Sequence, residues 1–115
     1  MHELSIAVSI VEIAEKEAAR RCVCVRAVHL RLGPLAGVVK EALLSAYELA
    51  SQNTSLAGTS LLVEDMPIVV HCPHCDQRRT LTSFEFRCPE CDTPTPEVVQ
   101  GRELEVFALE LGDAA

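Results

Sequence analysis

Cys72-Pro73-His74-Cys75 is followed, after the twelve residues 76–87, by Cys88-Pro89-Glu90-Cys91. Each C-x2-C pair can present two thiolates to one ion, and two such pairs facing each other form a closed tetrahedral site with four sulfur ligands. The spacing therefore predicts a zinc ribbon whose ligands are Cys72, Cys75, Cys88 and Cys91. A zinc site with four thiolates and no open position is structural, so we expect the functional chemistry to lie elsewhere in the chain.

The segment between the two cysteine pairs is short. Thr80-Leu81-Thr82 and Phe84-Glu85-Phe86 alternate as strands do, which predicts a hairpin between the pairs. So few residues cannot bury a core that is large enough to fold alone. We therefore expect metal binding and folding of this segment to be one free-energy event.

Two other interpretations of the four cysteines differ in their chemistry. Disulfides need an oxidising compartment, and the amino-terminal residues show neither the basic region nor the uninterrupted apolar region of a secretory signal, so the sequence disfavours disulfides. Iron also accepts four thiolates in a tetrahedron, which would make the segment an electron carrier. An iron site would colour the protein red, so the colour of the purified protein distinguishes iron from zinc.

The composition limits the partners that the protein can have. Its 115 residues are 49% hydrophobic, which suffices for one modest core and a metal-stabilised segment. A formal net charge of -7 and a sequence pI near 5.0 disfavour nucleic acid, and an aromatic content of 3% is too low for base-stacking surfaces. No apolar run approaches the roughly 20 residues that cross a bilayer, and no targeting segment is visible. We expect a soluble, cytoplasmic protein that binds neither nucleic acid nor membranes.

Two segments show the periodicity of helices. Residues 4–20 carry one polar stripe, and apolar residues cover the remaining surface, so a broad face of this helix should be buried. A second helix is expected over residues 38–52. Its apolar face is predicted to consist of Val39, Ala42, Leu43, Ala46, Leu49 and Ala50.

Three segments show the pattern of strands, at residues 22–32, 60–65 and 102–111. The alternation in the first changes phase near Arg26-Ala27, which indicates a bulge or burial on both faces. Ile68-Val69-Val70 continues in an extended conformation into the first cysteine pair. The predicted fold class is α+β, with a small three-stranded sheet and two helices that carry an inserted four-Cys zinc-ribbon domain.

The amino terminus offers a second set of metal ligands. The α-amine of Met1, the backbone amide nitrogen and imidazole of His2, and the amide of Glu3 could place four nitrogens around one ion in a plane. Square-planar nitrogen ligation favours Ni(II) or Cu(II), whereas zinc prefers a tetrahedron. From these residues alone, a terminal histidine that is simply solvated is the competing interpretation.

The two motifs together resemble the HypA/HybF family of [NiFe]-hydrogenase maturation proteins. The resemblance begins with Met1-His2-Glu3-Leu4-Ser5, includes the paired C-x2-C motifs, and runs nearly from end to end. Between and beyond these motifs it rests on Gly33, Glu41, Gly58-Thr59, Glu64-Asp65-Met66-Pro67 and Gly101-Arg102-Glu103-Leu104. Pro73 and Pro89 depart from the family pattern but leave the four cysteines in place.

The resemblance implies a nickel metallochaperone. It implies Ni(II) as cargo at Met1, His2 and Glu3, and structural Zn(II) at the four cysteines. The expected domains are a nickel-binding α/β domain at 1–67, a zinc-ribbon domain at 68–100, and a strand in 101–115 that returns to the first sheet. The family works with the GTPase HypB to load nickel into the hydrogenase large subunit, so these are the expected partners, together with a possible weak homodimer.

The remaining cysteines and histidines have simpler interpretations. Cys22 and Cys24 share one face of a predicted strand and are expected to be small core or edge residues. His29 is expected to be solvated or hydrogen-bonded, with accessory ligation as the alternative. His71 and His74 flank the first zinc thiolate, where either could approach the metal if a thiolate were displaced.

No nucleophile elbow, phosphate loop or paired-carboxylate signature appears in the sequence, so we expect no enzymatic activity. Two functions from different classes remain. The first is a nickel-delivery protein, which depends on a free amino terminus. The second is an interaction module in which the zinc ribbon holds a surface that docks a protein or nucleic acid.

Overall fold

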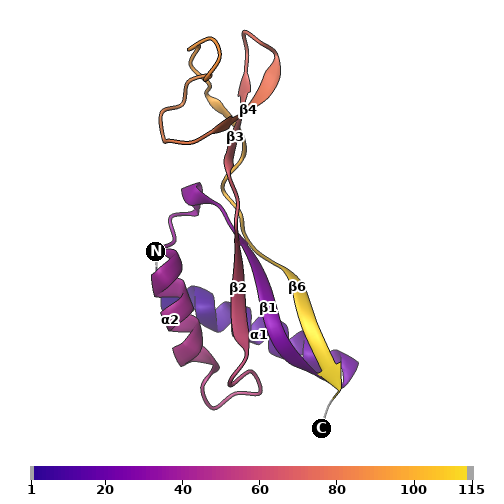
Figure 1. The fold of residues 1–115 in the computed structure, drawn as a ribbon. Helices are drawn as coiled ribbons and strands as arrows, with labels where there is room; N and C mark the ends of the chain where they lie inside the picture. Colours follow the sequence, from indigo (N-terminus) through magenta and orange to yellow (C-terminus); the bar gives the residue numbers. More distant parts are fainter. Residues whose placement is uncertain (1, 114–115) are drawn as a thin grey trace. The chain divides into compact units, whose positions relative to one another are not determined.

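The structure, a computed structural model, describes residues 2–113. The elements follow the order α1 (Glu3–Arg21), β1 (Val23–Leu32), the 3-10 turn η1 (Pro34–Ala36), α2 (Lys40–Ser51), β2 (Ser60–Asp65), β3 (Ile68–Cys72), β4 (Gln77–Leu81), β5 (Glu97–Gln100) and β6 (Leu104–Asp113) (Figure 1). No helix among these residues is both long and apolar enough to cross a membrane.

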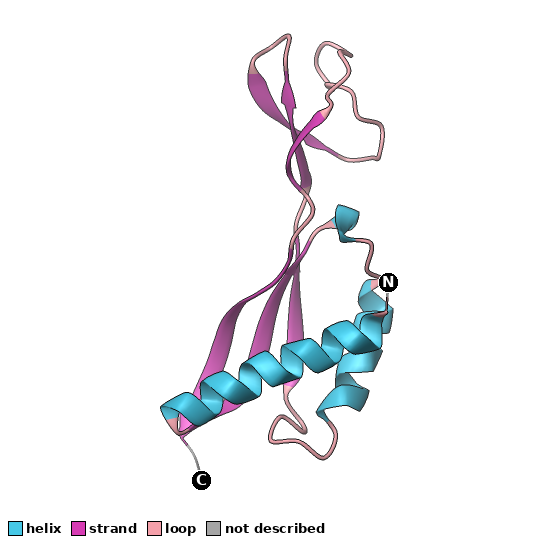
Figure 2. Ribbon diagram, turned by 180° about the vertical axis from the view of Figure 1, so that it is seen from behind, coloured by secondary structure: helices cyan, strands magenta, loops and turns pink. Residues whose placement is uncertain are grey.

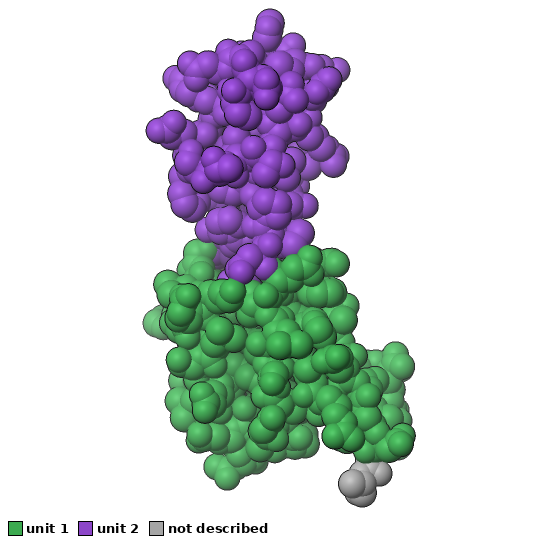
Figure 3. All heavy atoms as spheres, viewed as in Figure 1, with its two compact units in different colours: residues 1–31, 37–64, 105–115 green, residues 32–36, 65–104 purple. Residues whose placement is uncertain are grey.

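The chain divides into two compact units, which Figure 3 colours separately. Unit 1 comprises Met1–Arg31, Gly37–Glu64 and Glu105–Ala115, and unit 2 comprises Leu32–Ala36 and Asp65–Leu104. Each unit has one three-stranded sheet, in the order β2-β1-β6 and β4-β3-β5 respectively. The second sheet lies in the sequence between two strands of the first, which confirms that the four-cysteine segment is an insertion.

In unit 1, α1 runs across one face of the β2-β1-β6 sheet and packs against α2 (Figure 2). Side chains that recur at helical spacing on α1 are buried there, namely Ala7, Ile10, Val11, Ala14 and Ala18. The central strand β1 supplies the opposing apolar side chains, and its burial alternation shifts phase where Ala27 and Val28 are both buried. The predicted change of phase in this strand is therefore confirmed.

The predicted apolar face of α2 is wrong in part. The buried side chains of this helix are Leu43, Tyr47 and Ser51, whereas Leu49 and Val39 are each 59% exposed. Val39 is the N-cap residue and so precedes the first helical turn. Tyr47 can lie in the buried face because its hydroxyl pairs with Thr59 Oγ1 at 2.6 Å, which satisfies the polar end of an otherwise apolar ring.

Unit 2 has a small core. Ile68, Val70 and Leu81 are buried at its centre, and Leu35, Phe86 and Val98 pack against them. Strand β3 is central and pairs antiparallel with both β4 and β5. Three buried side chains contribute little to the free energy of folding, so a further interaction must stabilise this unit.

The predicted hairpin between the cysteine pairs is wrong. Thr80 and Leu81 belong to β4, whose partner is β3 rather than residues 84–86. Phe84 is 64% exposed and lies in an irregular segment. The third strand of this sheet, β5, follows the second cysteine pair and had no predicted counterpart. Local alternation showed where extended chain was possible, but the partner of each strand depends on contacts distant in sequence.

A close backbone approach at Gly33 leads to a first prediction. The Gly33 N–H donates to Glu103 O at 2.8 Å, and a Cβ at Gly33 would lie 2.1 Å from Gly101 O. The obstacle is backbone, so it cannot rotate away. Gly33→Ala is expected to destabilise unit 2 by about 3 kcal/mol, as overpacking does. Urea unfolding, monitored by amide exchange in the unit that carries the substitution, measures the loss of stability.

The matched control for that substitution is Gly58→Ala. Gly58 has φ +82, and a Cβ there would meet nothing within 4 Å, so only backbone strain of about 1 kcal/mol is expected. If Gly33→Ala were no more destabilising than Gly58→Ala, the close approach to Gly101 would not limit the fold.

Candidate metal centre

The first cysteine pair closes a tight turn at the end of β3. Cys72 is the last residue of the strand and is buried, and the Cys75 N–H points at Cys72 Sγ at 3.3 Å. Asp76 follows with φ 53, and its N–H donates to Cys72 O at 2.8 Å. This turn brings both sulfur atoms to one side of the chain and gives one of them an amide donor, an arrangement that favours thiolates.

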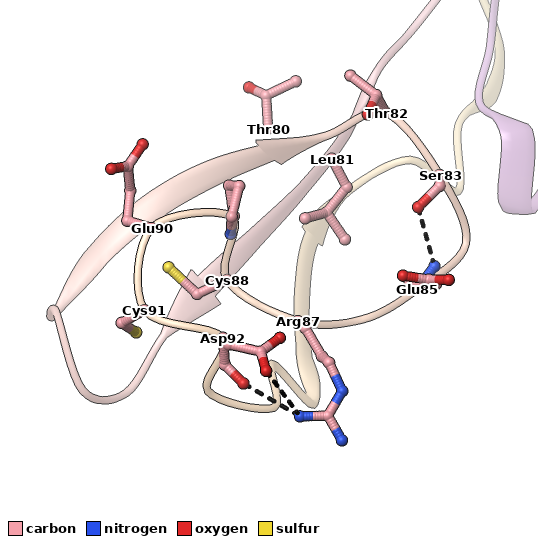
Figure 4. A pocket seen from close by; sticks show the side chains of 11 residues that line it. Thr80, Leu81, Thr82, Ser83, Glu85, Arg87, Cys88, Glu90, Cys91 and Asp92 are labelled. Carbon is pink, nitrogen blue, oxygen red and sulfur yellow. Dashed lines mark hydrogen bonds and ion pairs between the residues drawn. The ribbon is translucent and has the colours of Figure 1, made fainter.

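The second pair repeats this turn. Asp92 has φ 60 and donates its N–H to Cys88 O at 2.9 Å, as Asp76 does in the first turn. Thr93 Oγ1 lies 3.1 Å from Cys91 Sγ, where its hydroxyl can donate to a thiolate. On the outer side, Arg87 Nη1 donates to Asp92 O at 3.1 Å (Figure 4). The pocket shown in that figure is lined by Cys88 and Cys91 of this pair and by Leu81 of β4, among other residues.

The structure brings the sulfur atoms of Cys72, Cys75, Cys88 and Cys91 together. All four lie within 4.8 Å of one another, with Cys91 Sγ 3.5 Å from Cys72 Sγ and 3.6 Å from Cys75 Sγ. A zinc tetrahedron with Zn–S bonds of about 2.3 Å separates its sulfurs by about 3.8 Å, so the donor set fits such an ion. All six cysteines of the chain lie within the described residues and are free, so none of them forms a disulfide.

The thiols of the cluster differ in how readily they ionise. Burial raises the pKa of Cys88, but the backbone N–H groups of Cys91 and Glu90, followed by side-chain hydrogen bonds, bring that pKa down to about 6. The hydroxyl and backbone N–H of Thr93 lower the pKa of Cys91. The hydrogen-bond donors of the second turn therefore favour ionisation of its thiols.

The first turn behaves differently. For Cys75, a hydrogen bond with Arg79 lowers the pKa, but hydrogen bonds with the other three thiols of the cluster and burial outweigh it and raise the pKa to about 11. These neighbouring sulfurs make ionisation of the Cys75 thiol costly in free energy. A divalent cation would remove that cost, because it attracts all four sulfurs.

Two of the three residues predicted to bind nickel, His2 and Glu3, lie at the start of α1. His2 is the N-cap of this helix and is exposed, and Met1 lies outside the described residues. Glu3 is the first residue of α1, and its Oε2 accepts the Val39 N–H at 3.3 Å, next to the first turn of α2. The first amide groups of a helix have no partner within the helix. The His2 imidazole is thus open to solvent, while the Glu3 carboxylate is engaged within unit 1.

His71 and His29 have carboxylate partners. His71 Nε2 lies 2.9 Å from Asp76 Oδ1, and its Nδ1 lies 3.5 Å from Glu97 Oε2. His74 is exposed within the first turn, and neither His71 nor His74 belongs to the metal-ligating cluster found among residues 2–113. His29 lies 3.3 Å from Glu110 Oε2.

Cys22 and Cys24 lie apart from the four-cysteine cluster. Cys22 is exposed at the C-cap of α1, and the Cys24 thiol lies 3.0 Å from Asp113 O. Neither belongs to a group of three or more metal-ligating side chains among the described residues.

The sequence analysis missed several residues around the four sulfurs. Asp76 and Asp92 hold the two turns, Thr93 Oγ1 lies within hydrogen-bonding distance of Cys91 Sγ, and Arg79 interacts electrostatically with the cluster. One signal was available in the sequence, because the pattern Cys-Pro-x-Cys-Asp occurs twice and an acid in a left-handed turn is one of the few non-glycine residues that adopt that conformation readily.

Similarity to known proteins decides the family. Residues 1–111 match the family described as "Hydrogenase/urease nickel incorporation, metallochaperone, hypA". The chain belongs to the HypA family. It is 53% identical over 112 residues to the hydrogenase maturation factor HypA of Chloroflexus aurantiacus, covering 96% of this chain and 98% of that protein. It is 39% identical over 111 residues to HypA of Geobacter metallireducens, covering 96% and 99%.

Solved structures share the fold of this HypA-family chain. The solution structure of the Ni metallochaperone HypA from Helicobacter pylori matches with a TM-score of 0.66 and covers 96% of this chain and 97% of that one. A second structure, a solution structure of HypA protein, matches with a TM-score of 0.71 and covers 96% of each chain. Both are 21% identical to this chain, so they support the fold alone. The predicted α+β class and the resemblance to HypA are confirmed.

Proposed function

We propose that this member of a nickel-incorporation family binds Ni(II) at its amino terminus and delivers it to the large subunit of a [NiFe]-hydrogenase. The observation that carries the proposal is the family match over residues 1–111, which includes both the amino-terminal motif and the four cysteines. A HypB-type GTPase is the proposed partner in delivery. Nickel is cargo in this proposal and not a resident cofactor.

The ligands proposed for nickel are nitrogens of the first three residues. Met1 contributes its α-amine, His2 its imidazole and amide nitrogen, and Glu3 its amide nitrogen. A role for the Glu3 amide, rather than its carboxylate, is supported by the contact between that carboxylate and the Val39 N–H. Four nitrogens in a plane suit Ni(II). An exposed His2 also makes the cargo accessible, so a receiving protein can replace ligands one at a time.

Zinc is the proposed resident metal of the four-cysteine cluster. The support is the fit of the four sulfur positions to a tetrahedron and the donors that the two turns direct at them. When bound, zinc would supply the constraint that the small core of unit 2 lacks. In this proposal residues 1–67 bind nickel, residues 68–100 bind zinc, and residues 101–115 return to the first domain.

A transfer experiment tests delivery. The tag-free protein, loaded with one equivalent of nickel, is mixed with an immature hydrogenase large subunit and a HypB-type GTPase in the presence of a competing chelator. Nickel is expected to appear in the large subunit, measured by metal analysis after the proteins are separated. The control receives the same nickel as a chelate without the protein. Equal incorporation in both samples would contradict a delivery function.

A further inference from the structure

Arg79 is positioned on the metal side of the small sheet in unit 2. In the β3–β4 pairing, Arg79 lies opposite Val70 and Gln77 lies opposite Cys72. Because alternate residues of a strand share a face, the side chains of Arg79 and Gln77 leave the sheet on the same face as Val70 and the thiol of Cys72. The neighbouring Arg78 lies opposite His71 and therefore points to the other face.

The environment of Arg79 differs from that of an ordinary surface arginine. Its Nε atom is buried and has no hydrogen-bond partner in the part of the chain that the structure describes. Interactions of its guanidinium with the thiols of Cys75 and Cys88 raise the pKa of Arg79. A buried guanidinium nitrogen without an acceptor costs free energy unless negative charge lies nearby.

The proposed zinc site supplies that negative charge. One Zn²⁺ with four thiolates carries a net charge of -2, held in a partly buried site. Cys75 belongs to the first turn and Cys88 to the second, so in this proposal one planar guanidinium donates to a sulfur from each half of the site. Arginine suits this task better than lysine, because its five donors are fixed in a fork and its charge persists at any physiological pH.

On these observations, and resting on the zinc assignment proposed above, we propose that Arg79 is a positioning residue for the metal. It compensates the charge of a zinc–tetrathiolate by donating hydrogen bonds to Cys75 and Cys88, and it thereby slows loss of the ion. Donors to metal-bound thiolates withdraw charge from sulfur and hold the ligands in place, so outer-shell groups tune metal affinity as well as geometry.

Zinc dissociation from matched variants tests the inference. Arg79→Met keeps the aliphatic stem but removes the charge and the donors, and Arg78→Met makes the same change on the opposite face of the same strand. Zinc-loaded proteins are mixed with excess of a chromogenic chelator, and the rate of zinc transfer is followed by absorbance. Arg79→Met is expected to lose zinc about 10- to 100-fold faster than wild type, and Arg78→Met within about twofold of it.

A conservative variant and a spectroscopic signature separate charge compensation from packing. Arg79→Lys restores the charge without the fork and is expected to fall between Arg79→Met and wild type. In the cobalt-substituted proteins, Arg79→Met should move the sulfur-to-cobalt charge-transfer bands to lower energy, because unbonded thiolates are easier to oxidise, whereas Arg78→Met should not. If Arg79→Met does not fold, the rate of zinc loss and the charge-transfer bands are both measured on Arg79→Lys.

The outcomes distinguish this inference from the zinc assignment. Equal zinc-loss rates and unshifted bands in the Arg79 and Arg78 variants would overturn the role of Arg79 while leaving the zinc site intact. A wild-type protein that contains no zinc and takes up none would overturn the zinc assignment and this inference with it.

Discussion

We expect that replacing any one of Cys72, Cys75, Cys88 or Cys91 with alanine will abolish binding of the proposed zinc ion and unfold unit 2, while α1 and α2 persist. Three thiolates in this cluster leave one position of the tetrahedron to water, and an ion bound that way exchanges readily. Because forming the site and folding the segment are coupled, loss of the ion is loss of the fold in this part of the chain.

The size of the two cores explains why the damage stays local. Unit 2 buries three apolar side chains in its core cluster, and three more are partly buried against them. At roughly 1.5–3 kcal/mol for each fully buried side chain, these side chains cannot offset the conformational entropy that the 45 residues of unit 2 lose on folding. Unit 1 has its own helix–sheet core, formed by the buried faces of α1, α2 and β1.

Zinc analysis and amide exchange measure the two parts of this prediction. Each cysteine variant should contain much less than one zinc per chain and should lose protected amides in β3 and β4. Cys22→Ser and Cys24→Ser are the matched controls, since both residues lie outside the cluster, and their zinc and nickel content should equal that of wild type. A variant of the cluster that kept its full zinc would remove that cysteine from the ligand set.

A second large effect is expected at the amino terminus, where His2→Ala or any residue added before Met1 will weaken nickel binding by at least about 100-fold without removing zinc. His2→Ala removes the imidazole, and the extension converts the amine of Met1 into an amide. Each change removes a proposed ligand, which is the imidazole in the first case and the α-amine of Met1 in the second. The zinc cluster has a separate set of ligands, so it should be unaffected.

Glu3→Gln discriminates between the two ways in which Glu3 could contribute. If its amide nitrogen binds nickel while its carboxylate accepts the Val39 N–H, glutamine preserves the ligand and retains an oxygen acceptor for Val39. Nickel affinity should then change by no more than about threefold, because a charge near the site acts weakly in water. A loss as large as that of His2→Ala would assign the carboxylate to the metal instead.

Isothermal titration with nickel at several pH values measures these effects. Protons compete with nickel for the amine, the imidazole and the amide nitrogens, so affinity for the wild type should fall steeply as the pH is lowered. Zinc should stay bound at a lower pH than nickel, because four thiolates bind the zinc ion together. Equal nickel affinity in wild type, His2→Ala and the extended protein would place the nickel site elsewhere.

Local sequence was sufficient wherever neighbours in the chain determine the structure. The C-x2-C spacing predicted two facing turns, and the four sulfurs do come together. Helical periodicity placed α1 and α2 within two residues of their observed ends. It also predicted an apolar face on each helix, because a packed helix repeats its buried side chains every three to four residues.

The helical periodicity did not show which apolar residues of each helix would be buried. Leu4, Val8 and Ile13 of α1 are exposed, although Ala7, Ile10 and Val11 between them are buried. The face of α2 is centred on Tyr47, whose burial depends on a hydroxyl partner in the loop after the helix. Such choices depend on the position of the opposing element, which a one-dimensional pattern does not contain.

The family, the α+β class, the insertion of the metal segment and the meeting of the four sulfurs could be predicted from the sequence, because each depends on which residues occur and on their spacing along the chain. Only the folded chain showed the strand partners, including β5, the contact between Glu3 and the start of α2, and the placement of Arg79 opposite Val70 on the metal side of its sheet. These pairings depend on strand register and on contacts between separate elements, and a hydrogen bond or charge pair forms there only after packing has fixed the distance between its partners.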